Sequence, residues 1–311
     1  MAQQQPVIIQ WVVDTRPLWP NASKTKDLEQ AAARALALLT TDERVAVLRY
    51  YHVRDAKLSL ASHLLKRLAI ARYCRVPWRE AAPVRDSAHS KPVWRDPAGR
   101  EPLCFNVSHQ AGIVALFAVA DYPGPGRVDV GVDVVCPPER RDRDVAMLAS
   151  DGWERFVDIH SDVFGPREVE YLKTGIKASS SLPGRPGPGA SPVEVADFRL
   201  RCFYALWCLR EAYIKMTGEA LMAPWLRDLE FKGFRPPADE ADIVSQHEIY
   251  LHGQSVKDAN VCLRALGSDF MISAAVRTSE APKDGLGFRL GSFESIDMDE
   301  LLGEAEAAGG L

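Results

Sequence analysis

The chain has 311 residues, of which 47% are hydrophobic and 26% charged, as in globular proteins and unlike disordered, collagen-like or coiled-coil chains. Its 38 basic and 42 acidic side chains give a formal net charge of -4, so no overall field would attract nucleic acid or an anionic membrane. Any binding site for phosphate must therefore be local.

Targeting and membrane signals are missing from the sequence. The run MAQQQPVIIQWVVD has no basic segment and reaches Asp14 after a short apolar stretch, which predicts a strand and not a signal peptide. No stretch approaches the ~18 apolar residues of a membrane span. The six cysteines form no CxxC pair and have no histidine at ligand spacing, so neither zinc nor disulfides are expected. The expected location is the cytoplasm.

The first half reads as a mixture of strands and helices. Pro6–Asp14 predicts a strand, a first helix is expected over about Lys26–Leu39, and Thr40 is the N-cap of a second. Residues 56–74 (AKLSLASHLLKRLAIARYC) carry apolar side chains at helical spacing, which predicts a helix packed against a sheet. The apolar runs IVALFAVA (113–120) and VDVGVDVV (128–135) predict two strands, paired as a hairpin through a Pro/Gly turn.

The second half repeats this plan loosely. A helix is expected over Phe203–Met216, followed by four strands: Leu229–Phe231, Glu248–Leu251, Val261–Leu266 and Phe270–Val276. The predicted fold is therefore α+β, with two similar halves at 1–127 and 128–311. The Ser/Pro/Gly-rich stretch Ser179–Ser191 is expected to be a mobile surface loop, and FESIDMDELL in the acidic tail a docked final turn.

Three short stretches could carry chemistry, although each also has an ordinary structural explanation. FNVSHQ (105–110) offers four hydrogen-bonding side chains but could be a solvated loop, and the aspartate of GVDVV (131–135) could cap a turn. WCLREAYIK (207–215) places Glu211 and Lys215 four residues apart, which is often a surface pair worth only ~0.2–0.5 kcal/mol. Together, Asp133, Glu211 and the Gln110 amide would supply the oxygen ligands that Mg²⁺ prefers. His109 and Lys215 would then neutralise phosphate oxygens, which suits attack on a pyrophosphate.

These motifs resemble those of a known family, the Sfp-type 4′-phosphopantetheinyl transferases. GVD (131–133) and WCLREAYIK are similar to that family's two-part signature, and FNVSH and Lys91-Pro92 to its further motifs. The likeness extends from about Val7 to Val276, and residues 215–231 look like the broad-specificity fungal enzymes. It implies a monomer of two pseudo-symmetric α+β halves with coenzyme A in the cleft between them. It also implies Mg²⁺ and, as second substrate, the apo carrier proteins of fatty-acid, polyketide, peptide-synthetase or lysine pathways, with no nucleic acid or membrane partner.

Residue roles follow from the resemblance position by position. Asp133 and Glu211 look like the metal-binding carboxylates, with Glu211 accepting the proton of the carrier serine. Lys215 and His109 look like the charges that stabilise the reacting phosphate, and Lys91, Ser108, His109 and Lys215 like coenzyme contacts. Four arginines are equal candidates for binding the 3′-phosphate of the coenzyme: Arg44, Arg49, Arg54 and Arg85.

The sequence also departs from the bacterial pattern of the family. Val135 stands where bacterial members carry a second acid, and the third ligand is therefore assigned to Gln110, as in the animal and fungal type. Arg210 replaces the lysine that usually precedes Glu211, and Ala46 stands where a basic residue is expected. Two other functions stay open: a Mg²⁺-dependent hydrolase of nucleotide pyrophosphates, and a non-catalytic module that binds carrier proteins or coenzyme A.

Overall fold

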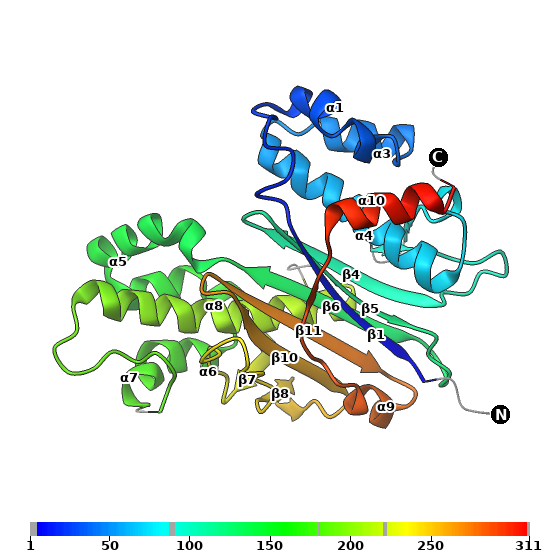
Figure 1. Ribbon diagram of the computed structural model, residues 1–311. Coiled ribbons are helices and arrows are strands. Elements are labelled where there is room, and N and C mark those ends of the chain that lie inside the picture. The colour runs from blue at the N-terminus through cyan, green and yellow to red at the C-terminus, as the bar shows by residue number, and fades with distance from the viewer. Residues whose placement is uncertain (1–4, 87–90, 180, 220–222, 310–311) are drawn as a thin grey trace. The chain divides into compact units, whose positions relative to one another are not determined.

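The computed structural model describes residues 5–86, 91–179, 181–219 and 223–309 (Figure 1). The chain forms two compact units: unit 1 is Met1–Val132 with Arg289–Leu311, and unit 2 is Asp133–Phe288. Both contain helices and sheets, so the predicted α+β class is confirmed. The expected division into 1–127 and 128–311 differs from this one, because the C-terminal tail belongs to unit 1.

Unit 1 is built around the four-stranded sheet β12-β1-β5-β4, in which β1 and β4 run antiparallel to β5 and β12 runs parallel to β1. Its elements, in chain order, are β1 (Val7–Asp14), α1 (Leu28–Ala31), α2 (Ala33–Leu36), α3 (Thr41–Leu48), α4 (Val53–Cys74), β2 (Val84–Arg85), β3 (Pro92–Val93), β4 (Leu103–Gln110), β5 (Ile113–Ala120), β12 (Glu294–Ser295) and α10 (Met298–Ala307). The predicted strand at Pro6–Asp14 and the helix over 56–74 are confirmed by β1 and α4.

The core of unit 1 lies between α4 and this sheet. Leu60, Leu64 and Leu68 of α4 are fully or almost fully buried, and they belong to one apolar cluster with Leu116 of β5 and Phe105 of β4. The helix expected over about Lys26–Leu39 is instead two short helices separated at Ala32, which has φ -115° and ψ 24°. Hydrogen bonds continue across this kink, since Ala32 donates to the Leu28 carbonyl and accepts from Leu36 N.

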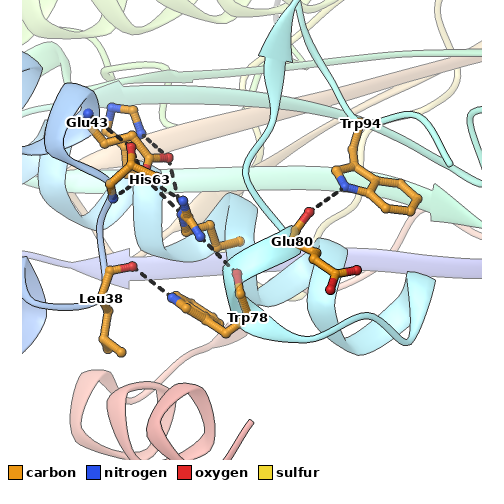
Figure 2. A network of polar contacts seen from close by, with 8 residues as sticks. Leu38, Glu43, His63, Trp78, Glu80 and Trp94 are labelled. Carbon is orange, nitrogen blue, oxygen red and sulfur yellow. Dashed lines mark hydrogen bonds and ion pairs between the residues drawn. The ribbon is translucent and has the colours of Figure 1, made fainter. Parts of the chain in front are cut away.

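A buried polar network joins α3 and α4 in unit 1 (Figure 2). Thr40 is the expected N-cap of α3 and forms a capping box with Glu43. The carboxylate of Glu43 also receives the guanidinium of Arg67, with 2.8 Å between Nη2 and Oε2. Arg67 is completely buried and donates to the carbonyl of Trp78, whose indole in turn donates to the Leu38 carbonyl. Each of the three guanidinium nitrogens of Arg67 thus has an acceptor, since Nε also donates to Glu43, and a buried charge requires such partners.

Unit 2 pairs the sheet β10-β11-β6 with the long helix α8, and adds the small sheet β7-β8-β9. Its elements are α5 (Pro137–Ile159), α6 (Pro166–Glu170), a π-helical turn (Tyr171–Gly175), α7 (Ile176–Ala178), α8 (Pro192–Thr217), β7 (Leu229–Lys232), β8 (Glu248–Leu251), β9 (Gln254–Ser255), β10 (Ala259–Leu266), β11 (Phe270–Thr278) and α9 (Pro282–Gly287). All four strands expected in this half are present. The helix α8 begins earlier than expected, at a Ser191–Glu194 capping box after which Pro192 is the first helical residue.

The strand β6 (Val128–Val135) contains the boundary between the units, and its neighbour is β11. The expected hairpin of the runs 113–120 and 128–135 is therefore wrong, although both runs are strands. The reason is topological: β5 has β1 on one edge and β4 on the other, so neither edge is left for β6.

The described residues of the stretch Ser179–Ser191 are irregular and mostly exposed, as expected of a surface loop, but two of its side chains are held by unit 2. The guanidinium of Arg185 donates to the carbonyls of Ile176, Lys177 and Ser179, and Leu182 is 9% exposed within the apolar core of unit 2. Ser180 is outside the described residues. The acidic tail is docked as expected but as a helix: α10 lies beside α4 (Figure 1), with Leu301 and Leu302 buried in the core of unit 1. Within the described part of the chain, no helix is both long and apolar enough to cross a membrane.

Candidate active site

Two acidic residues and one lysine meet in unit 2. Asp133 stands on β6 and is 6% exposed, while Glu211 and Lys215 stand on the last turns of α8. Nζ of Lys215 donates to Oδ1 of Asp133 over 2.6 Å. The helix ends just beyond, at Gly218, where a φ of 82° favours glycine. The Glu211/Lys215 pair is thus directed at a buried carboxylate, and the explanation as a solvated surface pair is excluded.

The electrostatics of Glu211 are unusual for an exposed helix position. Burial, followed by the negative charge of Asp133, raises the pKa of Glu211 from 4.5 to about 7, although Lys215 and Arg210 act in the opposite direction. A carboxylate whose pKa is raised by burial and by a second carboxylate beside it is typical of a functional site, and a cation there would relieve the repulsion. At neutral pH, Glu211 can both lose and accept a proton.

The donor set fits Mg²⁺. Asp133 and Glu211 repel one another in a partly desolvated place, and a divalent cation would relieve that repulsion. Across the described ranges, no three His, Cys, Asp or Glu side chains gather to hold a metal. Mg²⁺ is ordinarily bound through one or two carboxylates plus substrate phosphates and waters, so two carboxylates are sufficient protein ligands.

A thiol lies directly behind Asp133. Sγ of Cys208, on the turn of α8 before Glu211, is 3.4 Å from the Asp133 carbonyl oxygen and 3.6 Å from that of Met271. Burial raises the pKa of Cys208 well above its ordinary value, so the thiol stays protonated and can donate to a carbonyl. Cys208 therefore joins α8 to the backbone that carries Asp133. Sequence reasoning missed this role because nothing in the local pattern indicates it.

Arg210 does not face the reacting groups. It is 2% exposed, and its Nη1 donates to Oε2 of Glu168 and to the Leu229 carbonyl, both over 2.6 Å. Its Nη2 donates to the Leu226 carbonyl. The planar guanidinium thus fastens α8 to Glu168 and to the chain at 226–229 through two separate nitrogens, whereas a lysine would present all its donors from a single nitrogen.

The remaining candidates lie in unit 1, several of them on β4. The run FNVSHQ is part of this strand, so the solvated-loop explanation is wrong. Successive side chains of a strand alternate between its faces. Ser108 is therefore on the face of Asn106 and Gln110, where Oδ1 of Asn106 accepts from Val132 N over 3.0 Å. His109 is exposed and on the opposite face, with Phe105 and Val107 of the core. The structure thus separates Ser108 from His109, which the resemblance grouped together.

The basic candidates differ in their surroundings. Nζ of Lys91, before β3, lies 3.4 Å from the Val130 carbonyl, so this side chain runs along the first part of β6. Arg49, Arg54 and Arg85 are exposed, and Arg54 pairs only loosely with Asp55, over 3.7 Å. The three arginines come from three places, the end of α3, the first turn of α4 and β2.

Glu211, a carboxylate with a raised pKa, lies beside a second, buried carboxylate and an ammonium, and such a group suits metal-assisted transfer at phosphate. Two family models match the chain. One, described as "4'-phosphopantetheinyl transferase, N-terminal", matches residues 24–121, and the other, "4'-phosphopantetheinyl transferase superfamily", matches residues 129–264.

Curated relatives extend over nearly the whole chain. It is 53% identical to "4'-phosphopantetheinyl transferase 1" of Fusarium mangiferae, over 99% of this chain and 98% of that protein. It is 38% identical to a 4'-phosphopantetheinyl transferase of Aureobasidium melanogenum, over 88% and 92%. It is 33% identical to the 4'-phosphopantetheinyl transferase NpgA of Emericella nidulans, over 96% and 94%. The chain belongs to the 4′-phosphopantetheinyl transferase superfamily.

Proposed function

We propose that the protein transfers the 4′-phosphopantetheine group of coenzyme A to a serine of apo carrier proteins, in a Mg²⁺-dependent reaction. The observation that carries this proposal is the group Asp133, Glu211 and Lys215, which stands at the family's signature positions and has the charge and burial that the chemistry requires. The serine Oγ–P bond forms, the bond from phosphorus to the adenosine 3′,5′-bisphosphate oxygen breaks, and the serine proton goes to Glu211.

The proposed metal ligands are Asp133 and Glu211, with the amide oxygen of Gln110 as a third. Bound there, Mg²⁺ would supply positive charge to the oxygens of the pyrophosphate. The chain's own residues do the rest. Lys215, held beside Asp133, offers an ammonium to the charge that develops on phosphate, and Glu211, with its pKa near 7, accepts the serine proton directly or through water.

Coenzyme contacts are proposed from the resemblance and supported by the character of each side chain. Lys91, Ser108, His109 and Lys215 are assigned to the nucleotide and its phosphates, His109 also to charge stabilisation. The exposed guanidinium groups of Arg49, Arg54 and Arg85 are the candidates for the 3′-phosphate, because an exposed arginine can form two parallel bonds to phosphate oxygens.

Carrier proteins are the proposed second substrate, and the protein is proposed to act as a monomer because one chain supplies Asp133, Glu211 and Lys215. Relatives at lower identity include an "L-aminoadipate-semialdehyde dehydrogenase-phosphopantetheinyl transferase" of Schizosaccharomyces pombe, 28% identical over 68% of this chain. We therefore include the carrier domain of such a dehydrogenase among the proposed substrates, beside those of fatty-acid, polyketide and peptide synthases.

Mass spectrometry tests this function. Several apo carrier proteins would be incubated with coenzyme A, Mg²⁺ and the protein, beside carriers in which the target serine is alanine. We expect one phosphopantetheine on each intact carrier, none on the alanine controls, and one adenosine 3′,5′-bisphosphate released per modified serine. Release of that nucleotide without any carrier would instead identify a hydrolase, and coenzyme binding without either product a binding module.

A further inference from the structure

The strand β4 ends with His109 and Gln110, and the turn that joins it to β5 has a sequence that does not favour the turn's backbone angles. Gln110 of β4 pairs with Ile113 of β5, so only Ala111 and Gly112 form the turn. Both have positive φ, 48° and 91°. Turns of this kind favour Asn-Gly or Asp-Gly, and an alanine Cβ in the left-handed region crowds the next carbonyl oxygen. The turn therefore needs support from elsewhere in unit 1.

Thr15, the residue after β1, supplies that support. Its backbone N donates to the Gly112 carbonyl over 2.7 Å, and its Oγ1 donates to the same oxygen over 2.8 Å. Thr15 is 2% exposed, so both bonds are shielded from competing water. One carbonyl of the turn is thus held by two donors from a segment 97 residues earlier in the chain.

Arg16 covers the same turn. A Cβ on Gly112 would collide with the Cγ atom of Arg16, so the aliphatic part of this side chain lies directly on the glycine. The guanidinium is fixed by a fork to Asp14, with 2.9 Å from Nε to Oδ1 and 2.7 Å from Nη2 to Oδ2. The end of β1 and the two residues after it therefore hold the turn from two directions.

We infer that Thr15 is a positioning residue for the transfer reaction, acting through the turn on His109 and Gln110, which directly precede it. This inference rests on the proposed function of those two residues. Without the Oγ1 bond, the turn can relax toward backbone angles that suit Ala111, and the ends of β4 and β5 move with it. The inference assigns Thr15 no contact of its own with either substrate.

Thr15→Val tests the inference, because valine keeps the shape of threonine and leaves the backbone bond in place. Loss of one such hydrogen bond changes an equilibrium by about five-fold. We expect the KM for coenzyme A and the Mg²⁺ concentration at half-maximal rate to rise by about that factor, and kcat to fall by no more than the same factor, because His109 is also assigned to charge stabilisation. Thr15→Ser keeps the hydroxyl and should restore both constants.

A matched control and a double-mutant cycle separate positioning from general loss of stability. Thr278 is also fully buried and makes two such bonds, from Oγ1 to the Ala281 carbonyl and from Gly285 N to Oγ1, so Thr278→Val should lower Tm and leave both constants unchanged. If Thr15 acts through His109, Thr15→Val should change the KM for coenzyme A much less in a His109→Ala background than in the parent.

Ala111→Val provides a second route if Thr15→Val does not fold, since a β-branched residue at this φ loosens the turn while the two Thr15 bonds stay available. It should raise the same two constants. A folded Thr15→Val or Ala111→Val enzyme with parental KM and Mg²⁺ dependence overturns the inference while transfer by the parent still stands. No transfer by the parent itself would refute the proposed function instead.

Discussion

The ammonium of Lys215 lies 2.6 Å from the carboxylate of Asp133, a residue 82 positions earlier in the chain. This ion pair fixes the helix that carries Glu211 against the strand that carries Asp133. The charges of Asp133 and Lys215 are therefore already paired before any metal or substrate binds. The Asp133 side chain is 9% exposed and that of Lys215 is 29% exposed, so the pair is only weakly screened by solvent.

Glu211→Gln should depress turnover by orders of magnitude while coenzyme A still binds. The amide occupies the same space but cannot accept the serine proton. Steady-state kinetics with a carrier protein, beside calorimetric titration of coenzyme A, checks this. A variant with an unchanged rate would remove Glu211 from catalysis.

The thermal stabilisation by Mg²⁺ should depend on pH through Glu211. Because its pKa is raised from 4.5 to about 7, the folded protein holds a proton that the unfolded chain has lost, and in the metal-free protein this group costs stability as pH rises from 4.5 to 7. Mg²⁺ binds the deprotonated form, so the gain in Tm should be larger at pH 8 than at pH 6. Scanning fluorimetry measures this difference, and in Glu211→Gln it should largely vanish.

Gln110→Glu should keep activity and lower the Mg²⁺ requirement, because a carboxylate binds Mg²⁺ more strongly than an amide does. Gln110→Ala should raise the requirement. Titration of the initial rate with Mg²⁺ distinguishes them. Identical titrations for both variants and the parent would show that Gln110 is not a ligand.

Glu43→Gln should cost stability above pH 5 and little near pH 2. Burial alone would raise the pKa of Glu43, but bonds from His63, Arg67 and Thr40 outweigh it and lower the pKa from 4.5 to about 2. A carboxyl group whose pKa is lower in the folded than in the unfolded state stabilises the fold above pH 4.5. A shift of this size corresponds to about 3 kcal/mol of unfolding free energy, which is lost as the pH falls to 2. Urea unfolding at pH 7 and at pH 3 should show the gap between parent and variant narrowing on acidification.

Arg185→Ala should open the stretch 179–191 without affecting coenzyme A binding. The variant loses three bonds to the carbonyls of Ile176, Lys177 and Ser179, none of which belongs to the candidate site. We expect faster cleavage there by a protease at native conditions, with unchanged affinity for coenzyme A. A parallel loss of coenzyme affinity would show that this stretch contributes to the site.

Local periodicity predicted the regular elements well and their pairing poorly. The runs that became β1, α4 and β5 were readable because each presents a single apolar face or a continuous apolar core strand. The kink at Ala32 could not be predicted, because no glycine or proline marks it. The strand that pairs with β6 could not be predicted either. The free edge of a sheet depends on strands that are far away in the sequence.

For the candidate site, the motifs located the residues and the structure supplied their relations. The ion pair of Asp133 and Lys215 joins residues from two motifs, and each motif by itself also has an ordinary structural explanation. The opposite faces of Ser108 and His109 did not follow from the sequence, because FNVSHQ was interpreted as a possible loop, and neighbouring residues alternate between faces only in a strand. The Thr15 bonds to Gly112 could not be inferred either, because no sequence pattern joins a threonine after one strand to a turn 97 residues later.

The return of residues 289–311 to unit 1 bears on the order in which a ribosome-bound chain can fold. The last strand, β12, covers the open edge of β1, and Leu301 and Leu302 of α10 fill part of the first core. Unit 2 is continuous in sequence, so its residues have all emerged while unit 1 still lacks these pieces. The half that begins first is thus completed last, and until then the edge of β1 is open to pairing with other chains. A nascent protein stalled before residue 289 should be the species that recruits chaperones.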